Sequence, residues 1–170
     1  MTRYATQQAE EQAEALALDL AALGYPGFAH LRARPCAQTP AQVVLTALSQ
    51  ADLECRIVEA LPWVLLAYPA LDWTWLSERA QRLGLQNRLG FITNVARRLA
   101  EQYGELEKAA LLAREEATLE QSRLLREDTL CHASLTQAER RYLLEHRPTA
   151  AKHWRMLTDM EPEHLAHAIF

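Results

Sequence analysis

Residues 53–68 read LECRIVEALPWVLLAY, and they are apolar on nearly all sides of the helix that their spacing predicts. Asp52 stands where an N-cap residue is expected, and Pro69 cannot continue a helix. Pro62 lies inside the segment and is expected to kink or divide it. A helix that is hydrophobic all round belongs in a protein interior. We therefore predict that residues 53–68 form the central core helix of an all-α fold.

Helical spacing continues on both sides of this segment, and no strand pair is indicated. Helix ends are marked in the expected order, with Gly24 and Pro26 after the first helix and Thr39 and Pro40 before the second. The expected helices span residues 2–23, a segment that begins at Pro40, and residues 53–68, 73–83, 86–103, 105–128, 137–146, 148–158 and 162–170. The chain is thus predicted to be a helical bundle of seven to nine helices.

Residues 105–128 are predicted to form one long charged helix with a narrow stripe of small apolar side chains. Such a helix packs along one edge and leaves its other face in water. The alternative is a helix pair between two molecules, which would make a homodimer. A change of composition near Asp128 predicts a core domain, residues 1–128, and a helical C-terminal extension, residues 129–170. The extension is expected to pack back or to swap onto a partner.

The formal charge of −4 over 170 residues excludes a uniformly basic coat for nucleic acid, although it allows a local basic face. Three cysteines without a CxxC pair indicate free thiols in a reducing compartment. The N-terminal residues lack the apolar centre of a signal peptide. The longest apolar run, residues 60–67, is far shorter than the ~20 residues of a membrane span. We expect a soluble cytoplasmic protein with no membrane association.

Three of the four tryptophans lie close together, at Trp63, Trp73 and Trp75. Large aromatic rings are common anchors for a partner protein, but they also fill cores where helices meet. On one helix, Trp73 and Trp75 lie about 200° apart, so they cannot both face the same way. We expect one to be buried and the other to be exposed. Trp73 and Trp75 are therefore the candidate partner-binding residues.

Residues 76–99 carry five arginines against one glutamate, which gives a local charge of +4. The arginines are Arg79, Arg82, Arg88, Arg97 and Arg98. A basic patch can bind phosphates even on an acidic protein. The alternative is an ordinary helical hairpin with a glycine stop and solvated arginines.

Within this segment, residues 80–85 (AQRLGL) resemble the first half of the helix-turn-helix of bacterial DNA-binding regulators. The second half departs from that pattern, because Gly90 stands where the family has an aliphatic residue. The resemblance implies that the second helix meets DNA. Its DNA-binding residues would be Gln86, Asn87, Arg88, Arg97 and Arg98. Antitoxin-like regulators often pair such a part with one that binds a toxin, so the resemblance also implies a partner protein.

The C-terminal extension is rich in basic and imidazole side chains, namely Arg140, Arg141, His146, Arg147, Lys152, His153 and Arg155. They could form a second face for nucleic acid or an acidic partner. The favoured interpretation is that they complement the acidic helix 105–128 within the fold. His164 and His167 share a helix face at a spacing of three residues, but no HExxH or CxxC motif accompanies them. No metal site is expected.

The sequence contains no GxSxG motif, no phosphate-cradling glycine loop and no GxGxxG. Glu59 is the most notable acid, since it lies in the apolar segment within reach of Arg56. We expect neither catalytic residues nor a cofactor. The leading hypothesis is a non-enzymatic regulatory protein of antitoxin-like type that binds a partner protein, such as a toxin, and in addition DNA. The alternatives are a helix-turn-helix transcription regulator and a helical adaptor that binds no nucleic acid.

Overall fold

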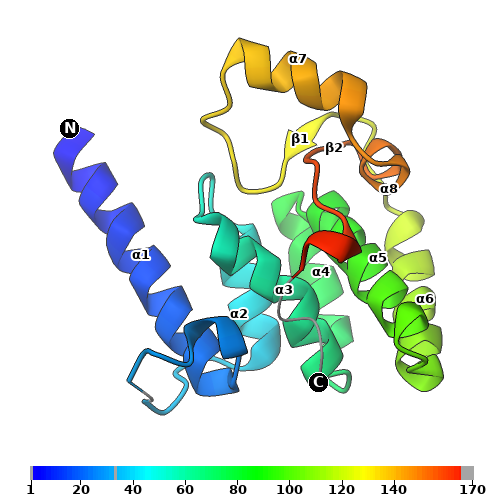
Figure 1. Cartoon of the computed structure of the whole chain (residues 1–170), viewed down its shortest axis with the longest axis horizontal. Helices are drawn as coiled ribbons and strands as arrows, with labels where there is room; N and C mark the ends of the chain where they lie inside the picture. The colour runs from blue at the N-terminus through cyan, green and yellow to red at the C-terminus, as the bar shows by residue number, and fades with distance from the viewer. Residues whose placement is uncertain (1, 33, 166–170) are drawn as a thin grey trace.

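The computed structural model describes residues 2–32 and 34–165, which form eight α-helices and one pair of short strands (Figure 1). The helices are α1 (Thr2–Leu23), α2 (Pro40–Leu48), α3 (Cys55–Ala67), α4 (Trp73–Leu83), α5 (Gln86–Gln102), α6 (Leu106–Glu120), α7 (Gln137–His146) and α8 (Thr149–His153). The remaining elements are the 3-10 helices η1 (Pro26–Phe28) and η2 (Pro162–His164) and the strands β1 (Asp128–Thr129) and β2 (Met156–Leu157). The predicted all-α bundle of seven to nine helices is confirmed.

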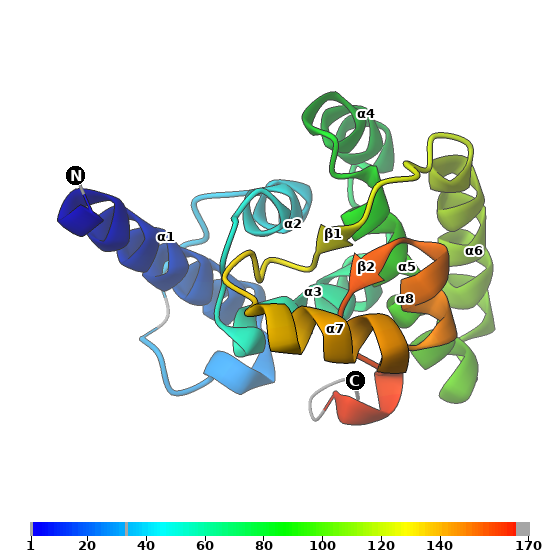
Figure 2. The ribbon, with the colours of Figure 1, turned by 90° about the horizontal axis from the view of Figure 1, so that it is seen from above.

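Helices α3 and α5 lie in the middle of the molecule, with α1 at one end and α6 at the other (Figures 1 and 2). α3 buries nine of its 13 residues, as the prediction of a core helix at 53–68 requires. α5 is equally central, because α3, α4, α6 and α8 all pack against it. Twelve of its 17 residues are buried, among them polar Gln86 and Asn94. Those polar residues give α5 the sequence pattern of a surface helix.

One local expectation for α3, the cap at Asp52, is wrong. Asp52 does not cap the helix, since its Oδ1 accepts hydrogen bonds from the backbone N–H of Ser134 at 3.0 Å and from its hydroxyl at 2.8 Å. Pro62 does not divide the helix, which continues from Cys55 to Ala67. The flanking residues on both sides of Pro62 are buried, and this packing outweighs the backbone hydrogen bond that proline removes.

Most other helix ends follow the expected signals. Thr39 forms a capping box with Gln42 at the start of α2. Asp72 caps α4 by accepting from the N–H of Trp75 at 3.0 Å, and Gly84 ends that helix with a left-handed φ of 70°. Thr136 forms a capping box with Glu139 at the start of α7.

The long charged helix predicted over residues 105–128 is shorter than expected, because α6 ends at Glu120. Residues 121–127 leave the helix and reach the start of α5. There the side-chain amides of Gln86 and Asn87 donate to the carbonyls of Ser122 and Leu124 at 3.0 and 2.8 Å. These bonds replace the intrahelical bonds that a longer α6 would have made.

The C-terminal residues also differ from the expected helices. The helix predicted over 148–158 ends at His153, and Arg155, with a φ of 57°, turns the chain into β2. β2 pairs in parallel with β1, although no strand pair was expected. Two residues per strand are too short to leave a period in the sequence. Of the helix predicted over 162–170, the structure shows η2, and residues 166–170 lie outside the described residues.

The predicted boundary near Asp128 does not separate two cores. Leu130, Trp154 and Met156 belong to the same buried cluster as α3 and α5, so the extension packs back onto the rest of the chain. Trp154 is fully buried against Gly90 of α5. A Cβ atom at position 90 would lie 2.4 Å from Cζ3 of the Trp154 ring, so only glycine leaves room for it. Gly90, which stands where the helix-turn-helix pattern has an aliphatic residue, is therefore the position on α5 against which Trp154 packs.

We expect Gly90→Ala to lower the free energy of unfolding by about 2 kcal/mol. Overpacking costs about 1–3 kcal/mol, and the better helix propensity of alanine offsets at most about 1 kcal/mol. Urea unfolding followed by circular dichroism measures the change. In a Trp154→Leu background the same substitution should cost much less, since the bulky ring is gone. An equal cost in both backgrounds would contradict the contact.

Candidate functional site

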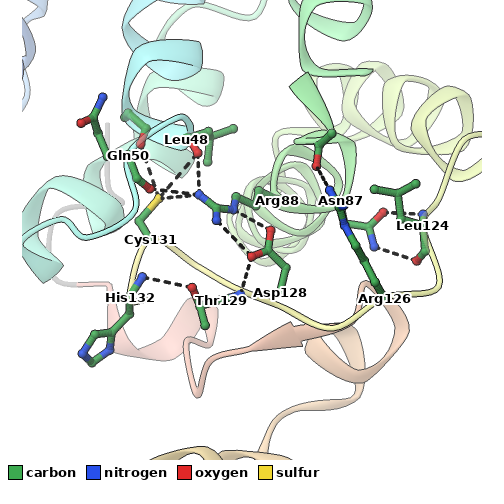
Figure 3. A network of polar contacts seen from close by, with 12 residues as sticks. Leu48, Gln50, Asn87, Arg88, Leu124, Arg126, Asp128, Thr129, Cys131 and His132 are labelled. Atoms are coloured by element: carbon green, nitrogen blue, oxygen red, sulfur yellow. Dashed lines mark hydrogen bonds and ion pairs between the residues drawn. The ribbon is translucent and has the colours of Figure 1, made fainter. Parts of the chain in front are cut away.

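Two residues expected to contact DNA, Gln86 and Asn87, are buried at the start of α5. Asn87 makes a reciprocal pair with Leu124, whose N–H donates to Asn87 Oδ1 at 2.8 Å while Asn87 Nδ2 donates to the Leu124 carbonyl at 2.8 Å (Figure 3). Gln86 bonds to the neighbouring Ser122 carbonyl at 3.0 Å. Both amides therefore hold the loop after α6 in place. In this structure they are not available to base edges.

Arg88, the third such residue, lies at a junction of separate segments (Figure 3). Its Nε and Nη2 donate to the two oxygens of Asp128 at 2.7 and 3.0 Å. Its Nη1 donates to the carbonyls of Leu48 and Gln50 at 2.7 and 3.0 Å. Burial lowers the pKa of Arg88, but the hydrogen bonds and the charge of Asp128 raise it by more than burial lowers it. The pKa therefore lies above its ordinary value, and the guanidinium stays charged. All three guanidinium nitrogens thus donate hydrogen bonds within the protein.

Cys131 lies beside this junction and is buried, with its thiol 3.4 Å from the Ala47 carbonyl. Burial raises the pKa of Cys131 to about 11, although the Arg88 charge acts in the opposite direction. At pH 7 such a thiol is ionised to only about one part in 10,000, and thiols react as thiolates. Cys131 is thus unsuited to act as a nucleophile.

The two remaining arginines of α5 differ from one another. Arg97 bonds to Glu116 of α6 at 2.7 Å and to Glu101 at 2.6 Å, and it fastens α6 to α5. Arg98 is half-buried and forms no ion pair with any described carboxylate. Of the five residues expected to contact DNA, four are therefore engaged inside the fold. The physical reason is that α5 is a core helix and not an exposed recognition helix.

The two candidate anchors on α4 lie on opposite faces, as the helical spacing predicts. Trp73 is buried, and its Nε1 donates to the Pro69 carbonyl at 3.1 Å, so it is a structural residue. Trp75 is half-buried at the surface, beside a shallow cleft that Pro40 also lines. The guanidinium carbon of Arg79 lies 5.9 Å from the centre of the Trp75 ring.

Trp75, Arg79, Arg82 and Leu83 form one stripe along α4, because the last three follow Trp75 by four, seven and eight residues. We call this stripe the α4 face. Arg79 and Arg82 are exposed and have no ion pair with a carboxylate in the described part of the chain. Leu83 is 57% exposed. The α4 face thus combines an aromatic ring, two free cations and an apolar end.

Three of the seven basic and imidazole side chains of the C-terminal extension pair with acids within the fold, so the favoured interpretation holds for part of the set. Arg147 bonds to both oxygens of Glu127, and Arg155 lies 3.8 Å from the same carboxylate. The bonds from Arg147 lower the pKa of Glu127. His153 pairs with Glu120 at the end of α6. Nothing in the local sequence marks these partners, since they lie 20 to 33 residues apart.

A cavity of about 190 Å³ lies between α3, α7 and β2. Glu59 and Cys131 line it together with Leu130 and Leu157. Over residues 2–32 and 34–165, no three His, Cys, Asp or Glu side chains gather in a way that could hold a metal ion. His167, which the sequence pairs with His164, lies outside the described residues. No helix in the described ranges is both long and apolar enough to cross a membrane.

Comparison with protein-family models, with curated proteins and with solved structures found no significant match to this chain.

Arg88→Gln is expected to lower the free energy of unfolding by about 2–3 kcal/mol, because it leaves Asp128 and two backbone carbonyls without their donor. Urea unfolding measures this loss. Arg140→Gln is the matched control, since Arg140 is exposed on α7 and should change stability by less than about 0.5 kcal/mol. Equal stability of the two variants would contradict the structural role of Arg88.

The three thiols are expected to react with iodoacetamide in the order of their exposure. Cys55 is exposed and should be modified first, while half-buried Cys36 should follow. Cys131 should react only after unfolding, because it is buried and its pKa is about 11. Peptide mass spectrometry at pH 7 with and without urea measures the order. Modification of native Cys131 as fast as Cys55 would refute this placement.

Proposed function

We propose that the chain is a non-enzymatic regulatory protein of antitoxin-like type, and that its α4 face binds an acidic surface on a partner protein. The observation that carries this proposal is Trp75, a large ring left at the surface with Arg79 over it. Tryptophan and arginine are the residue types that contribute most to protein interfaces. In the fold, the rest of the described chain leaves Arg79, Arg82 and Leu83 exposed.

The charge of the α4 face favours an acidic partner. Arg79 and Arg82 have Glu78 as their only acidic neighbour on α4. By contrast, the arginines of α5 and of the extension mostly pair with carboxylates of the fold. Cations at an interface rim speed association and select a partner of opposite charge.

DNA is the competing ligand for this face, since exposed arginines also bind phosphates. Specific reading of DNA needs side chains that reach base edges, and Gln86 and Asn87 are used inside the protein. Phosphate binding would leave the apolar surface of Trp75 and Leu83 without a role. We therefore favour a protein partner over a DNA sequence.

Trp75→Ala is expected to weaken binding of the partner by about 30-fold, the effect of losing an interface anchor worth about 2 kcal/mol. Affinity capture from the source cells, with this chain as bait, should recover one dominant acidic protein with the wild type and lose it with the variant. Tyr142→Ala is the matched control, because Tyr142 is 56% exposed on α7. Arg79→Glu with Arg82→Glu should also abolish recovery, whereas Arg140→Glu with Arg141→Glu should not.

Capture that is unchanged by Trp75→Ala would exclude the α4 face as the binding surface. Nuclease treatment of the captured material distinguishes a protein partner from nucleic acid, the competing ligand. If nuclease removes the captured material, and if recovery falls steeply with salt, the face binds nucleic acid and the protein-partner proposal is wrong.

A further inference from the structure

A cleft of about 420 Å³ lies between α5 and the start of α8, away from the residues of the α4 face. Asn94 and Arg98 line it from α5, and Thr149, Trp154 and Glu161 line it from the C-terminal extension. None of these five residues belongs to the surface proposed above for a partner protein. The cleft was not marked by any motif in the sequence.

Two buried polar atoms of the residues that line this cleft have no hydrogen-bond partner among the described residues: Nε1 of Trp154 and Oδ1 of Asn94. The orientation of the Asn94 amide is set by its Nδ2, which donates to Glu116 at 2.8 Å. The Trp154 ring has its benzene edge against Gly90, which leaves its N–H on the opposite edge. A buried donor and a buried acceptor without partners are each unfavourable, because neither regains the hydrogen bond that it made to water in the unfolded chain.

The charged groups at the cleft have opposite signs. Arg98 is half-buried and has no ion pair with a described carboxylate. Glu161 is half-buried, and no ion pair engages it within the described residues. The third ionisable neighbour, His153, is already hydrogen-bonded to Glu120. The cleft therefore offers one cation and one N–H donor, and also one anion and one carbonyl acceptor.

We propose that this cleft binds a small zwitterion of the amino-acid type. Its carboxylate would accept from the Arg98 guanidinium and the Trp154 N–H, and its ammonium would donate to Asn94 Oδ1 and face Glu161. Binding requires a side-chain adjustment at the floor of the cleft, because neither buried atom is exposed to solvent. Since both atoms are already removed from water, bonds to the ligand are gained there without loss of hydration. A ligand in this position would bridge α5 and the extension.

The indole N–H signals in a ¹H–¹⁵N NMR spectrum of the full chain test this site directly. Glycine is the zwitterionic probe, acetate carries the carboxylate alone, and methylammonium carries the cation alone. Glycine should shift the Trp154 indole signal in a saturable way at roughly millimolar concentrations. Acetate should shift it only at higher concentration, and methylammonium should not shift it. The Trp73 indole, which donates to Pro69, should stay unchanged throughout.

Arg98→Gln should weaken glycine binding about tenfold or more, because it removes the charge-assisted bond. Arg140→Gln is the matched control, since Arg140 is exposed on α7 and lies outside the cleft, and it should leave glycine binding unchanged. A Trp154 signal that none of the three probes moves would overturn the site. Equal binding of acetate and glycine to the wild type would overturn the zwitterionic ligand, and this comparison does not depend on any variant.

Discussion

The guanidinium of Arg88 joins segments that are distant in the sequence. It bonds to Asp128 at the start of β1 and to carbonyls at the end of α2, while its own helix, α5, lies in the core. A guanidinium this far from water is stable only where such acceptors are supplied. Through Asp128 the junction also places β1, and β1 pairs with β2, the strand that follows Trp154 in the chain. Arg88 thus contributes both to the docking of the C-terminal extension and to the position of α2, beside the packing of Trp154 on Gly90 and of α2 on α1, α3 and α4.

Four of the five arginines of residues 76–99 divide into two groups that the sequence does not separate. Arg88 and Arg97 of α5 are neutralised inside the fold, whereas Arg79 and Arg82 of α4 remain exposed. The division follows from burial, since α5 is enclosed by its neighbours and α4 is covered on one side only. Because of this difference in burial, the candidate binding surface lies on α4, the first helix of the helix-turn-helix-like segment, and not on α5, the second. For that reason we favour a protein partner that meets Trp75.

Local signals predicted most of the helices, because caps, glycine stops and apolar spacing act within a few residues. Thr39, Asp72 and Gly84 behave as their positions require. The predictions failed where a distant residue competes for the same hydrogen bonds. Asp52 bonds to Ser134 instead of capping α3, and Asn87 draws the chain at Leu124 out of the predicted long helix. The opposite orientations of Trp73 and Trp75 were predictable, because they follow from the helix period alone.

The sequence by itself determined the all-α class, the ends of most helices and the presence of aromatic and basic side chains near α4, since each depends on spacing along one helix. Only the tertiary structure decided which polar residues are buried. Gln86, Asn87 and Arg88 look like solvent-facing residues in a local window, but they complete hydrogen bonds of loops more than 30 residues away. Contacts over such separations leave no period in a single sequence, and they become visible only when the helices are packed together.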